Sequence, residues 1–113
     1  MKAFASCCLA LASCFATAAF ACDNPPMVAI PDGSVASLDE MVSAQNGVRE
    51  YMATMDEYLA CLNEELEAGG EDAPAEFKSL MVTRHNSAVT EMETVAAAFN
   101  EQLGAYRAAN PSE

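Results

Sequence analysis

A long run of regularly spaced apolar residues constrains the fold of this chain most strongly. Between residues 38 and 66, apolar side chains recur in alternating steps of three and four, interrupted only by Gln45. This spacing places them in one stripe along an α-helix, as in the seam between packed helices. The stripe consists of Leu38, Met41, Gln45, Val48, Met52, Met55, Leu59, Leu62 and Leu66. We therefore expect a long helix that packs through this stripe.

Start and stop signals bound this first helix. Ser37, followed three residues later by Glu40, forms a capping box, in which each side chain accepts a hydrogen bond from the backbone N–H of the other residue. The run ends at Gly69-Gly70, where glycine can adopt the left-handed conformation that closes a helix. We expect the helix to cover about residues 38–67.

A second helix is expected over about residues 74–109. Pro74 suits the first turn of a helix, and Asn110-Pro111 would stop it. The three-four spacing recurs, less regularly, at Met81, His85, Ala88, Met92, Val95, Phe99, Gln102 and Tyr106. The two helices predict an all-α fold, an antiparallel two-helix hairpin over residues 37–109 with a coiled-coil-like seam.

Residues 1–21 have the composition of a secretory signal peptide. A single base, Lys2, precedes a stretch rich in Ala, Leu, Phe, Cys and Ser that contains no acid. Ala19 and Ala21 supply the small residues that signal peptidase requires before a cleavage site at Cys22. We therefore expect the chain to be cleaved there and to be periplasmic or secreted.

Two other fates of this segment remain open. Leu11-Ala12-Ser13-Cys14 matches the pattern at which bacterial lipoproteins are cut and acylated, which would anchor the chain through Cys14. The stretch could also be retained as a membrane anchor, although Ala and Ser dilute its hydrophobicity. Cleavage is the preferred interpretation, and it leaves a mature chain without a transmembrane segment.

The charge balance excludes one large class of partners. The chain of 113 residues has 17 acids and 5 bases, for a net charge of -12. A phosphate backbone is bound by clusters of Lys and Arg, so nucleic acid is not expected as a partner. The hydrophobic content of 52% is raised by residues 1–21. The remainder has the composition of one small acidic globular domain.

Cysteine usage predicts one disulfide bond. Three of the five cysteines lie within residues 1–21, which leaves Cys22 and Cys61. Two cysteines in an oxidising compartment most often pair. In the chain-entropy model, a bond that closes a loop of about 40 residues contributes about 4 kcal/mol. No C-x-x-C motif indicates a redox-active pair.

Residues 22–36 are expected to form an extended, Pro-rich leader. Pro25-Pro26 favours polyproline geometry, and Pro31-Asp32-Gly33 is a turn signal. Extended over about 46 Å, the leader can run back along the first helix to a disulfide at Cys61. This third strip, or dimerisation into a four-helix bundle, would complete a core that two helices alone leave small.

Few residues suggest a chemical site. His85 is the single histidine, and we expect it to be partly buried near Met55, Asp56 and Leu59, with a hydrogen bond to Asp56 or to a backbone group. Methionines along both helices, together with His85, leave a copper or haem site open, although methionine at this spacing usually packs a core. The acids within residues 64–76 predict a solvated hairpin tip.

These patterns predict a non-enzymatic protein. The sequence contains no nucleophile elbow, phosphate-binding loop or histidine cluster, and no catalytic, cofactor-binding or metal-binding residue is assigned. The expected role is helix packing, either as a homodimer or with another envelope protein. The alternative role is binding of copper or haem through methionines and His85.

Overall fold

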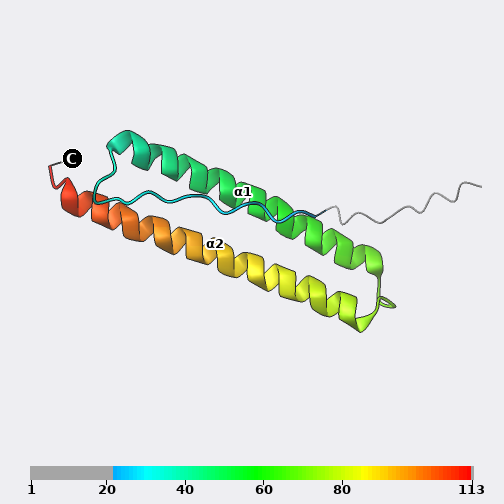
Figure 1. Ribbon diagram of the computed structural model, residues 1–113. Helices are drawn as coiled ribbons and strands as arrows, with labels where there is room; N and C mark the ends of the chain where they lie inside the picture. The colour runs from blue at the N-terminus through cyan, green and yellow to red at the C-terminus, as the bar shows by residue number, and fades with distance from the viewer. Residues whose placement is uncertain (1–21, 113) are drawn as a thin grey trace, which may run out of the picture.

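Two long antiparallel helices form the body of the protein (Figure 1). The computed structural model describes residues 22–112. Within this range α1 spans Leu38–Gly69, α2 spans Ala75–Ala109, and there is no strand. A disulfide joins Cys22 to Cys61. The prediction of an all-α hairpin with one disulfide is therefore confirmed.

The ends of the helices follow local sequence signals. At the start of α1, the Glu40 amide donates to Ser37 Oγ over 3.2 Å, and the Ser37 amide donates to Glu40 Oε2 over 2.7 Å, so the capping box is present. At its end, Gly70 has a φ of 69° and its amide donates to the Glu67 carbonyl. Pro74 is the N-cap of α2, directly before the first helical residue, and it makes no side-chain cap hydrogen bond.

The seam of α2 is buried where the sequence predicted it. Five of its members have almost no exposed surface, namely Met81, Ala88, Val95, Phe99 and Tyr106. Three others are half-buried, namely His85, Met92 and Gln102. The spacing of α2 was the less regular of the two, yet it locates the core side of this helix correctly.

The stripe predicted for α1 is only partly correct. Three of its members are buried, namely Met41, Met55 and Leu62. Two are exposed, namely Leu38 and Gln45. Three residues outside the stripe are buried, namely Ala44, Tyr51 and Tyr58. The buried side of α1 is therefore rotated toward the row of Ala44, Tyr51 and Tyr58, each seven residues from the next.

Contacts with the segment before the helices explain this rotation. Tyr51 and Tyr58 belong to the same hydrophobic cluster as Cys22, and Val28 and Ile30 pack against that cluster. Aromatic rings in these positions lose their contact with water, because apolar side chains from outside the hairpin lie over them. The two-helix periodicity alone carries no information on which flank is covered in this way.

Residues 22–36 have no regular secondary structure and extend alongside both helices (Figure 1). Next to α2, the Gly33 amide donates to Gln102 Oε1 over 2.9 Å. Beside α1, the Val28 Cγ2 lies 3.2 Å from the point where a Cβ on Gly47 would be. A turn at Asp32, closed by hydrogen bonds from Val35 and Ala36 to its carbonyl, leads into α1.

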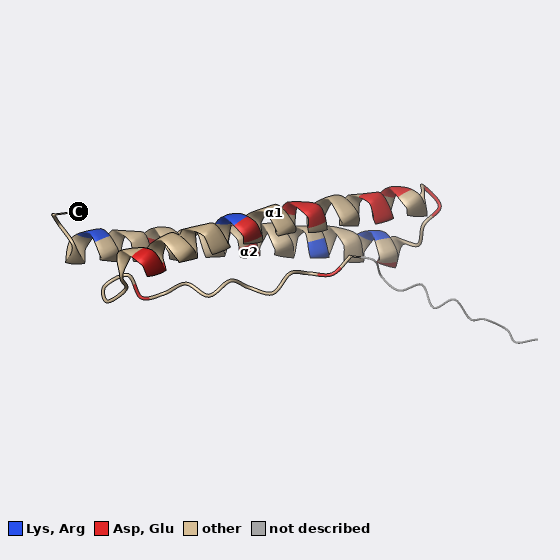
Figure 2. Cartoon of the chain, turned by 90° about the horizontal axis from the view of Figure 1, so that it is seen from above, with Lys and Arg blue, Asp and Glu red and all other residues tan. Residues whose placement is uncertain are grey.

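Charged residues are distributed unevenly along the hairpin. Figure 2 shows acidic residues gathered toward the end of α1 and in the connection to α2, which we call the tip. The opposite end, which we call the open end, contains the start of α1 and the end of α2, where Arg107 lies in the last turn. No helix within residues 22–112 is long and apolar enough to span a membrane.

Candidate functional site

The disulfide and a neighbouring carboxylate form one polar cluster on the side of the extended segment. Cys22 is 7% exposed, and its Cα lies 5.7 Å from that of Cys61. Glu65 follows Cys61 by one turn of α1. One carboxylate oxygen of Glu65 and the two sulfur atoms all lie within 4.8 Å of one another.

Glu65 corrects the prediction that every acid of the tip is solvated. Its residue surface is half-buried, and its Oε2 is fully buried without a hydrogen-bond partner. Buried carboxylate oxygens are normally hydrogen-bonded, because losing water without a replacement donor is costly. The four-residue spacing between Cys61 and Glu65 was a signal for this cluster, but the sequence analysis placed Glu65 with the exposed acids.

A shallow groove of about 250 Å³ runs beside the disulfide. Its lining comprises Cys22, Asp23, Thr54, Glu57, Tyr58 and Cys61. Two acids and no base border this groove, so its electrostatic potential favours cations over anions. The groove also leaves one side of the disulfide within reach of small molecules in solution.

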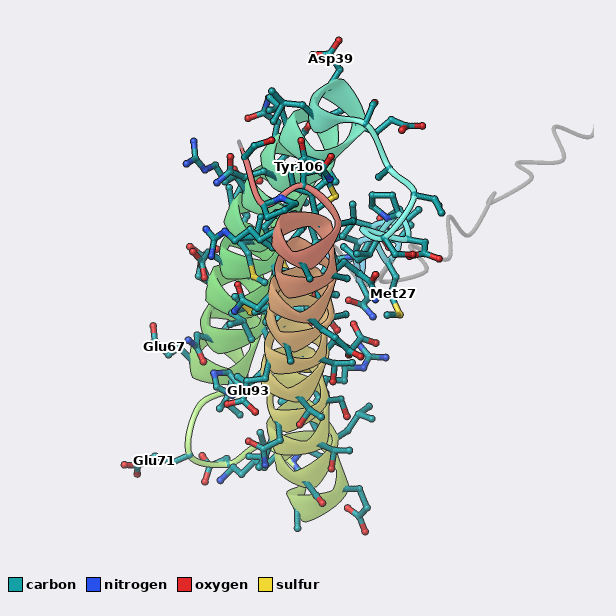
Figure 3. The ribbon with its side chains drawn as sticks, turned by 90° about the vertical axis from the view of Figure 1, so that its left-hand side faces the viewer. Met27, Asp39, Glu67, Glu71, Glu93 and Tyr106 are labelled. Atoms are coloured by element: carbon teal, nitrogen blue, oxygen red, sulfur yellow. A yellow bond between two sulfur atoms is a disulfide. The ribbon has the colours of Figure 1, made fainter. Side chains whose placement is uncertain are left out.

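A second feature is the side of the hairpin that faces away from the extended segment. We call it the open face and define it by two rows with seven-residue spacing, namely Leu38, Gln45, Met52, Leu59 and Leu66 on α1 and Val82, Val89, Ala96 and Leu103 on α2. Eight of these nine residues are apolar, yet none is buried. Figure 3 shows Met27 of the extended segment on one side of the hairpin and Glu67 and Glu93 on the other.

The open face has a groove at each end. Near the tip, Leu66 and Val82 line a groove of about 210 Å³ together with His85. Near the open end, Leu38, Gln45 and Leu103 belong to the lining of a groove of about 230 Å³. Grooves between apolar side chains at both ends are typical of a surface that receives side chains from another helix.

The surroundings of His85 differ from the prediction. It lines the groove at the tip with Leu62, Asn63, Leu66, Met81 and Val82. Among the described residues no hydrogen bond joins it to Asp56. The reason is the register of the hairpin, since residues 70–74 separate the helices and the midpoint of the turn is residue 72 rather than 70. His85 therefore lies further toward the C-terminal end of α1 than expected.

The methionines are distributed between core and surface. Met41, Met55 and Met81 are buried among apolar side chains of two separate clusters, whereas Met27 is 61% exposed. His85 belongs to no group of three metal-binding His, Cys, Asp or Glu side chains within residues 22–112. The arrangement of Met55 and Met81 is that of flexible core residues that fill a helix interface.

Tyr51 is a buried polar side chain that the sequence analysis did not identify. It is 5% exposed, and its hydroxyl has no hydrogen-bond partner. Burial, and then the negative charge of Glu91, raise the pKa of Tyr51 above its ordinary value. Glu91 also accepts a 3.4 Å hydrogen bond from Asn24 Nδ2, so the carboxylate that acts on Tyr51 takes part in a contact between α2 and the extended segment.

Three residues of the predicted processing sites, Ala19, Ala21 and Cys14, lie outside the described residues. The disulfide predicted between Cys22 and Cys61 is present. The disulfide cluster and the open face are thus the two features from which a function can be inferred. Comparison with protein-family models, curated proteins and solved structures gives no match for this chain.

Proposed function

We propose that this chain is a secreted, non-enzymatic helical protein that pairs with a second copy through the open face. The carrying observation is the unequal burial of the two flanks of α1. Tyr51 and Tyr58 are buried on one flank, whereas Met52 and Leu59, each one residue further along, pack against the same core cluster but are only half-buried on the other. An apolar flank that is only partly covered is stabilised by a partner, because association removes its remaining exposed surface from water.

The other flank of α1 is covered by the extended segment. We infer that the leader of residues 22–36 acts as a third packed strip. Contacts of Val28 and Ile30 with the core and the disulfide at Cys22 support this role. The leader occupies only one flank, so the second flank is left for another chain.

The size of the open face suits a stable dimer. Helices of 32 and 35 residues are about 50 Å long at 1.5 Å per residue. Two neighbouring helices present a face about 20 Å wide, so its footprint is about 1,000 Å² per copy. Stable interfaces bury about 800 Å² per partner, and the open face therefore offers enough area.

The charges favour an antiparallel pair. A parallel arrangement would bring two acidic tips together, which is unfavourable at short range. An antiparallel arrangement keeps the two tips apart and places each against an open end, which has Arg107 in the last turn of α2 as well as Asp39 and Glu40 in the first turn of α1. In this orientation the exposed Leu38 and Val42 of one copy approach the tip groove of the other. Four helices then form one bundle.

A matched pair of alanines on α2 tests this proposal. Ala96 belongs to the open face and is half-buried, whereas Ala97 is exposed on another side of the helix. Glutamate is a good helix former, so Ala96→Glu and Ala97→Glu differ mainly in where they place a charge. Sedimentation equilibrium should show a dimer for the wild type and for Ala97→Glu. For Ala96→Glu we expect the dimer dissociation constant to be at least tenfold higher, so that the monomer predominates.

Two results would contradict self-association. One is a wild-type protein that stays monomeric across a dilution series up to high micromolar concentration. The other is an equal effect of both substitutions, with helix content unchanged by circular dichroism. A monomer that instead binds another envelope protein through the open face would overturn the homodimer and favour the second partner class.

A further inference from the structure

The disulfide cluster brings together three side chains of the types that bind thiophilic metal ions. Cys61 and Glu65 lie one turn apart on α1, and Cys22 comes from the extended segment. The two sulfur atoms and one carboxylate oxygen lie within 4.8 Å of one another. In the oxidised protein the sulfur atoms are bonded to each other and are not available as thiolate ligands.

We propose that reduction of this disulfide creates a binding site for a divalent cation of the zinc type, with Cys22, Cys61 and Glu65 as ligands. Zinc takes thiolate sulfur at about 2.3 Å and carboxylate oxygen at about 2.0–2.2 Å in a tetrahedral arrangement. Ligand atoms around such an ion are therefore about 3.3–3.8 Å apart. In the oxidised protein the carboxylate oxygen lies within 4.8 Å of both sulfur atoms, and the two sulfur atoms must move apart once their bond is reduced.

The buried oxygen of Glu65 is an independent observation that points to a cation. Its Oε2 lies out of contact with water and has no hydrogen-bond donor. A carboxylate oxygen in this position lacks the partner that buried acceptors normally have. A metal ion between the sulfur atoms and Glu65 supplies that partner and offsets the loss of hydration.

The reduction step balances with a dithiol as the reductant. The dithiol transfers two electrons and two protons to the S–S bond by thiol–disulfide exchange and becomes a disulfide itself. Binding of the divalent ion then displaces the two thiol protons to solvent, because thiolates are the metal ligands. Asp23 and Glu57 of the groove are not members of the three-residue cluster, and their charges add to the attraction for a cation.

The groove beside the cluster supplies access. It has a volume of about 250 Å³ and includes both cysteines in its lining. A water molecule can therefore complete the fourth position around the ion. Asp23 and Glu57 border the same groove, and their charges favour entry of a cation.

The test compares the oxidised and reduced forms of the mature chain. The protein is reduced with a phosphine, which is removed under nitrogen, and is titrated with Co²⁺ and Zn²⁺. We expect one equivalent of Co²⁺ to give a sulfur-to-cobalt charge-transfer band, Zn²⁺ to abolish this band, and the oxidised protein to show neither effect. Cys22→Ser and Cys61→Ser should each remove the stoichiometric site.

Glu65→Gln identifies the carboxylate ligand, with Glu64→Gln as its control. Glu64 precedes Glu65 on α1 but is exposed, so its neutral variant changes the net charge equally without touching the cluster. We expect Glu65→Gln to weaken Zn²⁺ binding 10- to 100-fold and Glu64→Gln to leave it within twofold. Equal affinities for the two variants would overturn the role of Glu65.

A structural readout covers the case in which reduction loosens the fold. Circular dichroism of the reduced chain should show that Zn²⁺ raises its melting temperature, and that Glu64→Gln retains this rise. A reduced chain that neither binds Zn²⁺ stoichiometrically nor gains thermal stability from it would overturn the proposal. Equal binding by the oxidised chain would overturn it as well.

Discussion

The amide of Gly33 donates a 2.9 Å hydrogen bond to the side chain of Gln102, and the backbone carbonyl of Gln102 occupies the place where a Cβ on Gly33 would lie. These two residues join the extended segment to α2 more closely than any side chain at position 33 would permit. The contact lies near the open end, far along the chain from the disulfide at Cys22, so the segment is attached to the hairpin at two separated points.

Gly33→Ala is expected to lower the free energy of unfolding by about 1–3 kcal/mol. The added methyl group overlaps backbone atoms of Gln102 that cannot rotate away, so the contact and its hydrogen bond must yield. Gly104→Ala is the control, because a Cβ there meets no atom within 4 Å. Since Gly104 lies inside α2, its replacement should raise stability by about 0.5–1 kcal/mol. Urea denaturation measures both, and equal stability of Gly33→Ala and wild type would contradict the close contact.

Loss of the disulfide is expected to cost about 4 kcal/mol of stability. The bond joins residues with a sequence separation of 39. By closing this loop it lowers the conformational entropy of the unfolded chain, which stabilises the folded state. Small domains have a total stability of only about 5–15 kcal/mol, so this loss is a large share. The double variant Cys22→Ala/Cys61→Ala should show it as a lower urea midpoint at pH 7. A midpoint equal to that of the oxidised wild type would show that the bond adds no constraint.

Tyr51→Phe should leave the stability at pH 7 unchanged or raise it by about 1 kcal/mol. The substitution removes a buried hydroxyl without a partner and keeps the ring in place. In the wild type, burial and the charge of Glu91 raise the pKa of Tyr51 in the folded state. The neutral phenol is therefore favoured by folding, and this contribution is lost as the pH rises above about 10 through the folded pKa. Denaturation at pH 7 and pH 11 checks this, since Tyr51→Phe should be less sensitive to alkali than wild type.

Ser37→Ala is expected to lower stability by about 1 kcal/mol through loss of the helix cap. Hydrogen bonds from the Ser37 backbone and then its side chain lower the pKa of Glu40. A lowered pKa means that the charged carboxylate is favoured by folding, so this contribution is present above the ordinary pKa of Glu40 and is lost as the pH falls through the folded value. Chemical denaturation at pH 7 and pH 3 should therefore separate wild type from Ser37→Ala more at pH 7. An equal difference at both pH values would contradict the link to Glu40.

The hairpin was predictable because its signals are local. The capping box of Ser37 and Glu40, the glycines after α1 and the spacing along α2 each act within a few residues. The core side of α1 was not predictable from the sequence, because both flanks of this helix are apolar. Leu59 and Tyr58 are neighbours in the sequence, and only the packing of a distant segment beside Tyr58 distinguishes the buried one.

The candidate site was predictable in one part only. Pairing of Cys22 with Cys61 followed from the count of cysteines beyond residue 21. The burial of Glu65 depends on where Cys22 is held against α1. The acidic composition of residues 64–76 predicted instead that Glu65 would be solvated. The neighbours of His85 depend on the length of the turn between the helices. Gly69-Gly70 predicts where α1 ends but not how many residues follow before α2 begins, and that number determines which residues of the two helices face each other.

The disulfide also determines how the protein responds to mechanical tension. Force that enters at Cys22 passes through the covalent bond directly to Cys61, so the intervening segment carries none of the load. Because the bonded positions have a sequence separation of 39, about 130 Å of chain cannot be drawn out by stretching, at roughly 3.4 Å per residue. Most of α1 is thereby shielded, and a pull on the two ends acts on its last turns and on α2 alone.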